Sequence, residues 1–197
     1  LAASGLLSAT MGGPGVRPYQ PENIWNVVGL PGGNTRNYKQ DTGEKLYRRT
    51  IYNFWKRMAH PPNMEAFNAP SREVCTVRRE RTNTPLQALV TMNDPQFVEA
   101  ARALAQGALQ SSSGDDSVAL DYIARRALCR PLRSNEANIL RACLDDHMTY
   151  YKANLTDAKA LIKVGESMAD PTLDPRKLAA WTMLCNQVLN LDEVLNK

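Results

Sequence analysis

The chain has 197 residues, of which 43% are apolar and 22% charged, a composition typical of a folded globular protein rather than a disordered one. No apolar run approaches the roughly 18 residues that a membrane-spanning helix needs, so the sequence predicts no membrane span. The net charge of +4 is unevenly placed, because residues 45–81 hold nine basic and three acidic side chains. We therefore expect any electrostatic function to lie in this segment.

The first part of the chain is rich in glycine, proline and asparagine from residue 11 to residue 44, which predicts long loops. One short helix is expected in PENIWNVVG, with Pro21 at its first position and Gly29 at its end. The glycines of GGPG at 12–15 are interpreted as turn residues with positive φ, since no lysine and helix follow in the pattern of a phosphate-binding loop. Because the chain begins with Leu1 rather than Met, we expect it to be the C-terminal piece of a longer protein.

The next segment, LYRRTIYNFWKR at 46–57, fits either a strand or a helix. We favour an extended conformation, because HPP at 60–62 interrupts the chain and REVCTVRR at 72–79 offers a second strand. The sequence thus allows one short β hairpin.

Three helix starts are marked by a small polar residue that precedes proline, at Thr84, Asp94 and Asp174. Such a side chain accepts hydrogen bonds from the first free amides, and proline at the first helical position loses no bond. Helices are therefore expected to begin at residues 85, 95 and 175. Two more are expected, one at 116–129 and one capped by Ser134.

The predicted fold class is mainly α, an irregular helical bundle with a loop-rich N-terminal section. We treat residues 1–197 as a single helical domain. Its composition divides it into a loop-rich basic section at 1–83 and a helical bundle section at 84–197.

Cysteine and histidine content gives no strong sign of a metal site. The four cysteines show no C-x-x-C spacing; they are Cys75, Cys129, Cys143 and Cys185. Three of the four sit among apolar residues at helical spacing, so we favour buried free thiols over two disulfides. His147 follows Cys143 by four residues, but no second ligand pair accompanies them, and we predict no metal and no cofactor in this chain.

Catalytic motifs are equally hard to find. The sequence contains no G-x-S-x-G, and no serine has an evident base and orienting group, so no catalytic residue is predicted.

The basic, aromatic stretch at 45–81 supplies the candidate site. Its arginines and one tryptophan fit an anionic ligand, since guanidinium groups bind sulfate or carboxylate and indole rings stack on sugars. A nucleic-acid partner is not expected, because the positive charge is too interrupted. The sequence favours the competing, structural interpretation, in which the aromatic side chains lie in the core. We then expect at least two of Arg78, Arg79 and Arg81 to bond within the domain to carboxylates or to loop and helix-end carbonyls. The candidate ligand-binding residues are Arg48, Arg49, Arg72, Arg78, Arg79, Arg81 and Trp55.

Several long sequence words resemble one family: GGPGVRPYQP, YRRTIYNFWKR, FNAPSREVCTVRRERTNTPLQALVTMNDPQFVEAARALA and AAWTMLCNQVLNLDEVL. They resemble domain-of-unknown-function family 1553, the C-terminal region of planctomycete-type cytochrome c domain-containing proteins. Two positions depart from the family pattern. Asn68 stands where aspartate is usual, and Cys129 stands where glycine is usual.

The resemblance implies an extracytoplasmic multidomain protein with haem on another domain. It also implies neighbouring genes that encode polysaccharide-degrading systems. It implies the upstream domain of the same protein and an anionic polysaccharide as partners. Three functions stay open from the sequence. The first is a non-catalytic domain that supports binding or degradation of complex, sulfated polysaccharide. The second is part of an enzyme whose site forms with the upstream domain, and the third is a docking domain for a haem-bearing electron-transfer domain.

Overall fold

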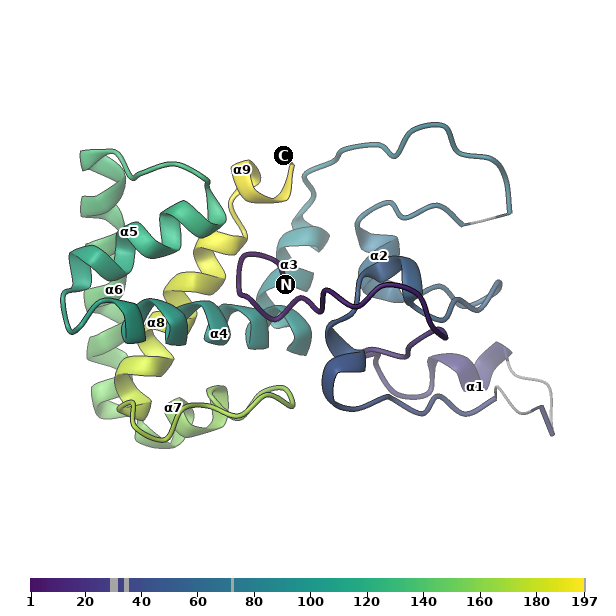
Figure 1. Cartoon of the computed structure of the whole chain (residues 1–197), viewed down its shortest axis with the longest axis horizontal. Coiled ribbons are helices and arrows are strands. Elements are labelled where there is room, and N and C mark those ends of the chain that lie inside the picture. The colour runs from purple at the N-terminus through teal and green to yellow at the C-terminus, as the bar shows by residue number, and fades with distance from the viewer. Residues whose placement is uncertain (29–31, 34–35, 72, 197) are drawn as a thin grey trace. The chain divides into compact units, whose positions relative to one another are not determined.

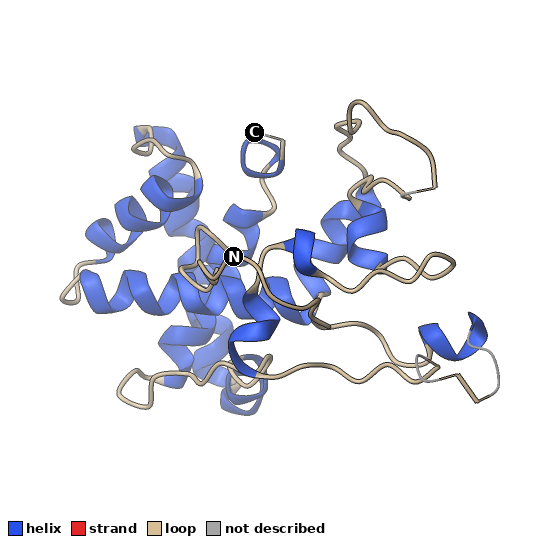
Figure 2. Ribbon diagram, turned by 45° about the vertical axis from the view of Figure 1, so that its right-hand side comes forward, coloured by secondary structure: helices blue, strands red, loops and turns tan. Residues whose placement is uncertain are grey.

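The protein is mainly α-helical, as the sequence predicts (Figures 1 and 2). The computed structural model describes every residue except 29–31, 34–35, 72 and 197. The helices in chain order are α1 (Ile24–Val28), α2 (Pro62–Ala66), α3 (Pro85–Asn93), α4 (Pro95–Ser111), α5 (Asp116–Ala127), α6 (Ser134–Ala153), α7 (Leu155–Leu161), α8 (Pro175–Leu189) and α9 (Asp192–Leu195). Two 3₁₀ helices, η1 (Gly43–Tyr47) and η2 (Thr50–Tyr52), lie between α1 and α2.

Two compact units make up the chain. Unit 1 comprises residues 1–6 and 91–197, and unit 2 comprises residues 7–90. The division falls inside α3, close to the change of sequence composition at residues 83 and 84. The N-terminal residues join unit 1 because the Arg126 guanidinium donates to the carbonyl oxygens of Ala3 at 2.6 Å and Ala2 at 3.4 Å. None of the described helices is long and apolar enough to cross a membrane.

The three predicted helix starts at proline are confirmed. Asp94 accepts a hydrogen bond from the Gln96 amide at 2.8 Å, and Asp174 accepts one from the Arg176 amide at 3.0 Å. Thr84 accepts from the Gln87 amide at 3.3 Å, while the Gln87 side chain accepts from the Thr84 amide at 3.1 Å. Each pair satisfies amides that the first helical turn leaves without a partner.

Helix α8 is the centre of unit 1, and α4, α5, α6, α7 and α9 all pack against it. It is buried on several sides, since Leu178, Trp181 and Leu184 are all fully covered. Helices α4 and α8 meet through small side chains, and small residues let two helix backbones approach closely while still excluding water. These side chains are Ala101, Ala105 and Ala108 on α4 and Ala179 and Ala180 on α8.

A buried ion pair joins α4 to the loop between α7 and α8. Glu99 and Arg102 are 0% and 2% exposed, with 3.6 Å between the Arg102 Nη2 and Glu99 Oε1 atoms. Glu99 accepts the Ser167 amide at 2.5 Å, and Arg102 donates to the Ile162 and Ser167 carbonyl oxygens. Gly165 lies against this pair with φ +87°, and a Cβ atom there would come within 2.3 Å of the Glu99 Cδ.

The expected β hairpin is absent from the described residues, which hold only the isolated bridges Val16–Asn53 and Lys56–Ala59. The segment 46–57 pairs with residues 8–16 instead of 72–79. The Ser8 amide donates to the Tyr47 carbonyl at 2.9 Å, and the Val16 amide donates to the Tyr52 carbonyl at 2.8 Å. The backbone carbonyls of this segment therefore bond to amides of the preceding loop. The spacing of apolar residues does not predict that partner.

Two helix starts differ from the sequence prediction. Ser134 is the first residue of α6 rather than its cap, because the Arg133 amide is satisfied by Glu136 reaching back at 2.8 Å. Helix α1 begins at Ile24 rather than Pro21, because Asn23 adopts φ +65° and a left-handed residue interrupts a helix. The predicted stop at Gly29 lies outside the described residues.

The four cysteines are free thiols, but only Cys185 is buried, and this burial raises the pKa of its thiol. Cys143 is half-buried, whereas Cys75 and Cys129 are exposed, so the expectation of burial is wrong for these two. Cys129 follows the last residues of α5 with φ +60°, a conformation that suits glycine.

Replacing Gly165 with alanine is expected to lower the free energy of unfolding by about 2–5 kcal/mol, from left-handed strain of about 1–2 and overpacking of about 1–3. Gly114 is the matched control, because it has φ +95° with nothing within 4 Å of an added Cβ. Urea unfolding followed by circular dichroism measures both variants. Equal losses at the two positions would contradict the role assigned to Glu99.

Replacing Cys129 with glycine is expected to raise the free energy of unfolding by about 1 kcal/mol, because glycine adopts the left-handed conformation without strain. Thermal and urea melts under reducing conditions measure the effect. Cys75→Gly is the control, since Cys75 is equally exposed but has no positive φ. A gain at both positions, or at neither, would show that backbone strain at Cys129 is not the cause.

Candidate functional site

The candidate ligand-binding residues lie in unit 2, and the structure separates them into two kinds. Arg48 is buried. The other described arginines of the set, Arg49, Arg78, Arg79 and Arg81, are exposed. Arg72 lies outside the described residues.

Arg48 is enclosed by the glycine-rich loop at residues 10–14. Its Nη2 donates to the carbonyl oxygens of Thr10, at 3.2 Å, and Gly12, and its Nη1 donates to Pro14 at 3.4 Å. The guanidinium carbon lies 3.9 Å from the centre of the Tyr52 ring, a cation–π contact. Gly12 and Gly13 adopt φ of +77° and +85°, so positive φ is confirmed for these two glycines. The Nη1 and Nη2 donors of Arg48 are thus used by the loop and not by a ligand.

Arg49, Arg78 and Arg79 differ from Arg48 in having free donors. None of their side chains makes a hydrogen bond or ion pair within the part of the chain that the structure describes. We had expected at least two of Arg78, Arg79 and Arg81 to be bonded inside the domain. Arg78 and Arg79 have no partner among the described residues, so this expectation is wrong for these two.

The loop that carries Arg78 and Arg79 is anchored at its C-terminal end. Near its start, Arg57 and Glu73 form an exposed ion pair at 2.9 Å, which adds little to its stability. Near its end, Asn68 donates through Nδ2 to the Thr82 hydroxyl at 2.7 Å, and Gln87 donates to the same hydroxyl at 2.8 Å. Asn68 adopts φ +55°, which asparagine tolerates better than most residues. The amide donor of Asn68 is one that the aspartate usual in the family lacks.

The aromatic residues of unit 2 form a cluster around Trp25, which is 2% exposed. The Tyr38 ring meets Trp25 edge-on at 4.8 Å, and the Phe54 ring lies 5.4 Å away. The Lys56 ammonium lies 4.9 Å from the centre of the Trp25 ring. Trp55, the tryptophan singled out from the sequence, is half-buried beside His60, with ring centroids 5.2 Å apart. Packing thus accounts for most of this aromatic content.

Unit 1 contains an apolar cavity of about 390 Å³ that the sequence did not suggest. Side chains from α5, α6, α8 and α9 line it, including Ile123, Leu140 and Val188. Arg130, Glu136 and Glu193 also lie in its wall. The lining is mainly apolar, so the cavity can hold an apolar group.

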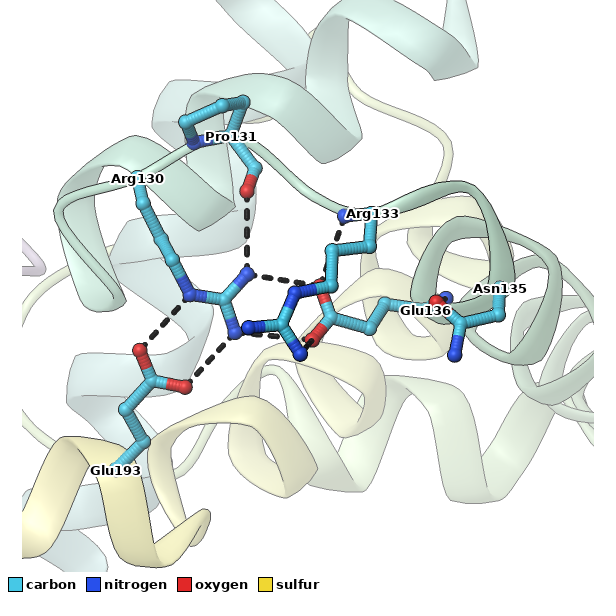
Figure 3. Close-up of polar contacts among 6 residues, drawn as sticks. All are labelled: Arg130, Pro131, Arg133, Asn135, Glu136 and Glu193. Carbon is cyan, nitrogen blue, oxygen red and sulfur yellow. Dashed lines mark hydrogen bonds and ion pairs between the residues drawn. The ribbon is translucent and has the colours of Figure 1, made fainter.

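Arg130 binds two carboxylates at once, as Figure 3 shows. Its Nε and Nη2 donate to Glu193 at 2.9 and 2.8 Å, and its Nη1 and Nη2 donate to Glu136 at 2.8 and 2.9 Å. These bonds hold the pKa of the Glu136 carboxyl at about 2, with a smaller effect from the Arg133 amide. The same bonds raise the pKa of Arg130. This arrangement ties α9 to α6 through one side chain.

No group of three or more side chains able to ligate a metal occurs among the described residues. Cys143 and His147 are both half-buried on α6, while Asp145 and Asp146 are exposed to solvent on the same helix.

Comparison with known proteins gives one match. A family model described as a protein of unknown function (DUF1553) matches residues 1–144. No curated protein and no solved structure matches the chain. The matched residues include all of unit 2 and the arginine segment.

We expect Glu136→Gln to destabilise the protein at neutral pH and to do so less as the pH falls from about 4.5 towards 2. A carboxyl whose folded-state pKa is lowered stabilises the fold above its unfolded pKa and loses this effect as acid protonates it. Urea midpoints across this pH range measure the difference. In an Arg130→Gln background the same replacement should lose most of its pH dependence. An unchanged pH dependence there would mean that Arg130 is not the cause.

Proposed function

The chain belongs to the family described as a protein of unknown function (DUF1553), and from its arginine segment we propose that it is a non-catalytic domain that binds an anionic, sulfated polysaccharide. The observation that carries this proposal is the exposure of Arg49, Arg78 and Arg79 without partners among the described residues.

The chemistry of these side chains supports an anionic ligand. Guanidinium is a planar group with five donors that binds sulfate or carboxylate oxygens in pairs. An exposed arginine with no internal partner loses no existing bond when it binds such an anion. Arg57, by contrast, is already paired with Glu73, and Arg48 with loop carbonyls.

The anchored end of the arginine loop also favours binding. Bonds from Asn68 and Gln87 to Thr82 fix the backbone close to Arg81. Fixing the loop before binding lowers the entropy that the ligand must overcome. A polymeric anion further gains from contacting several arginines at once.

A binding role fits the described residues better than catalysis. The arginine segment has no neighbouring nucleophile with a base, and electrostatic stabilisation by arginine needs a reacting group to act upon. Family resemblance alone supports the remaining parts of the proposal. These are a location outside the cytoplasm, an upstream domain in the same protein as partner, and haem on another domain.

The test compares dextran sulfate with dextran, which share a backbone and differ in charge. Arg78→Gln combined with Arg79→Gln is expected to weaken dextran sulfate binding at least about tenfold at low ionic strength and to reduce its salt dependence. Isothermal titration calorimetry measures both effects. Dextran should not bind at the arginine segment.

The control removes two exposed arginines of unit 1, Arg125→Gln with Arg133→Gln, and so changes net charge equally. This variant should bind dextran sulfate nearly as well as the wild type. Equal losses in the two double variants would show that net charge alone drives binding, and would overturn the proposed site.

A further inference from the structure

Unit 2 contains a second cavity, of about 420 Å³, whose lining differs in chemistry from the arginine segment. Carboxamide and aromatic side chains predominate in the wall, namely Gln20, Asn23, Trp25, Asn37, Tyr38 and Gln40. The volume is within the range of roughly 300–1,000 Å³ that is usual for small-molecule sites.

The wall is nearly uncharged. Glu22 is the only ionisable carboxylate among the described lining residues, and none of these is a lysine or arginine. The Lys56 ammonium, 4.9 Å from the centre of the Trp25 ring, is not among them. An anion in the cavity would therefore meet the Glu22 carboxylate and no described lining cation.

A carboxamide offers both donors and an acceptor, which matches a hydroxyl group, since a hydroxyl also donates and accepts. Asn23 already accepts a bond from Asn26 Nδ2 at 2.7 Å, so Gln20, Asn37 and Gln40 are the carboxamides that carry the match.

The aromatic part of the wall is held in a fixed position. The Tyr38 hydroxyl donates to the Pro18 carbonyl, and the Tyr38 ring packs edge-on against Trp25. Burial and the nearby Asp41 raise the pKa of Tyr38, so its hydroxyl stays neutral. A rigid, amphipathic aromatic wall costs little entropy when a ligand packs on it.

Two buried donors in this wall lack partners in the described part of the chain: the Trp25 Nε1 and the Gln20 Nε2. A buried donor without an acceptor costs about 1–3 kcal/mol, so such groups are rare in folded proteins and call for an explanation. An acceptor brought by a ligand, after a rotation of the half-buried Gln20 side chain, would remove part of that cost.

We propose that this cavity binds one neutral, hydroxyl-rich ring of monosaccharide size. The ring comes either from a free sugar or from a unit of a glycan chain, because both present the same hydroxyl groups. This inference goes beyond the proposed anion binding, since it concerns other residues and an uncharged ligand. The two can fail independently.

The experiment follows the side-chain amide signals of Asn37 and Gln40 by heteronuclear NMR in the intact chain. Both residues are exposed, so Asn37→Ala and Gln40→Ala assign these signals without disturbing the core. The probes are the methyl glycosides of glucose, galactose, mannose and xylose. Maltohexaose and cellohexaose separate a chain from a free sugar, and glucose 6-sulfate is the anionic comparison.

We expect at least one neutral glycoside to shift both signals saturably. The double variant Asn37→Ala with Gln40→Ala should bind it at least about tenfold more weakly, the loss typical of about one hydrogen bond. Lys39 lies between Asn37 and Gln40 in the sequence but does not line the cavity, so the Lys39→Ala variant should bind the glycoside as the wild type does. No saturable shift with any neutral probe, binding of glucose 6-sulfate alone, or unchanged affinity in the double variant would each overturn the proposal. None of these outcomes bears on dextran sulfate binding by Arg78 and Arg79.

Discussion

The carbonyl groups of irregular backbone need hydrogen-bond partners, and in both units arginine side chains supply them. Arg48 donates to three carbonyls of the loop at residues 10–14, and Arg102 donates to two carbonyls of the loop after α7. Arg126 does the same for residues 2 and 3. A loop cannot satisfy these groups through a ladder or a helix, so a side chain with several donors takes their place. Loss of such an arginine would leave several carbonyls without partners at once.

This requirement also decides which arginines remain available for a ligand. Arginines of the basic segment at 45–81 fall into three groups. Arg48 is enclosed by backbone carbonyls, and Arg57 is paired with a carboxylate. Arg49, Arg78 and Arg79 have no partner among the described residues. Only the last group can bind an external anion without first breaking an internal bond. The sequence shows the same residue type in each case, and the surrounding backbone makes the difference.

Local rules account for what the sequence predicted correctly. An N-cap involves residues two or three positions apart, as at Asp94 and Asp174, and so can be read from a short stretch of sequence. The sequence does not show which arginines bond inside the chain, because their partners are distant. Arg48 bonds to Gly12, Arg102 to Ser167 and Arg130 to Glu193, each pair separated by tens of residues. The same holds for residues 46–57, whose partner segment precedes them. The sequence had directed attention to residues 72–79 instead.

The two cavities follow from the same contrast between regular and irregular backbone. In unit 1, regular helices bring apolar side chains together, so the cavity between them is mainly apolar, and the Arg130 cluster and Asp192 add charge to its wall. In unit 2, few residues are helical, and turn-forming asparagine and glutamine side chains come to line the cavity beside Trp25. Asparagine is favoured in loops because its amide bonds to nearby backbone and its φ tolerates positive values. A loop-rich unit therefore concentrates carboxamide side chains. The packed rings of Trp25 and Tyr38 complete the wall of the proposed sugar site and hold it in place.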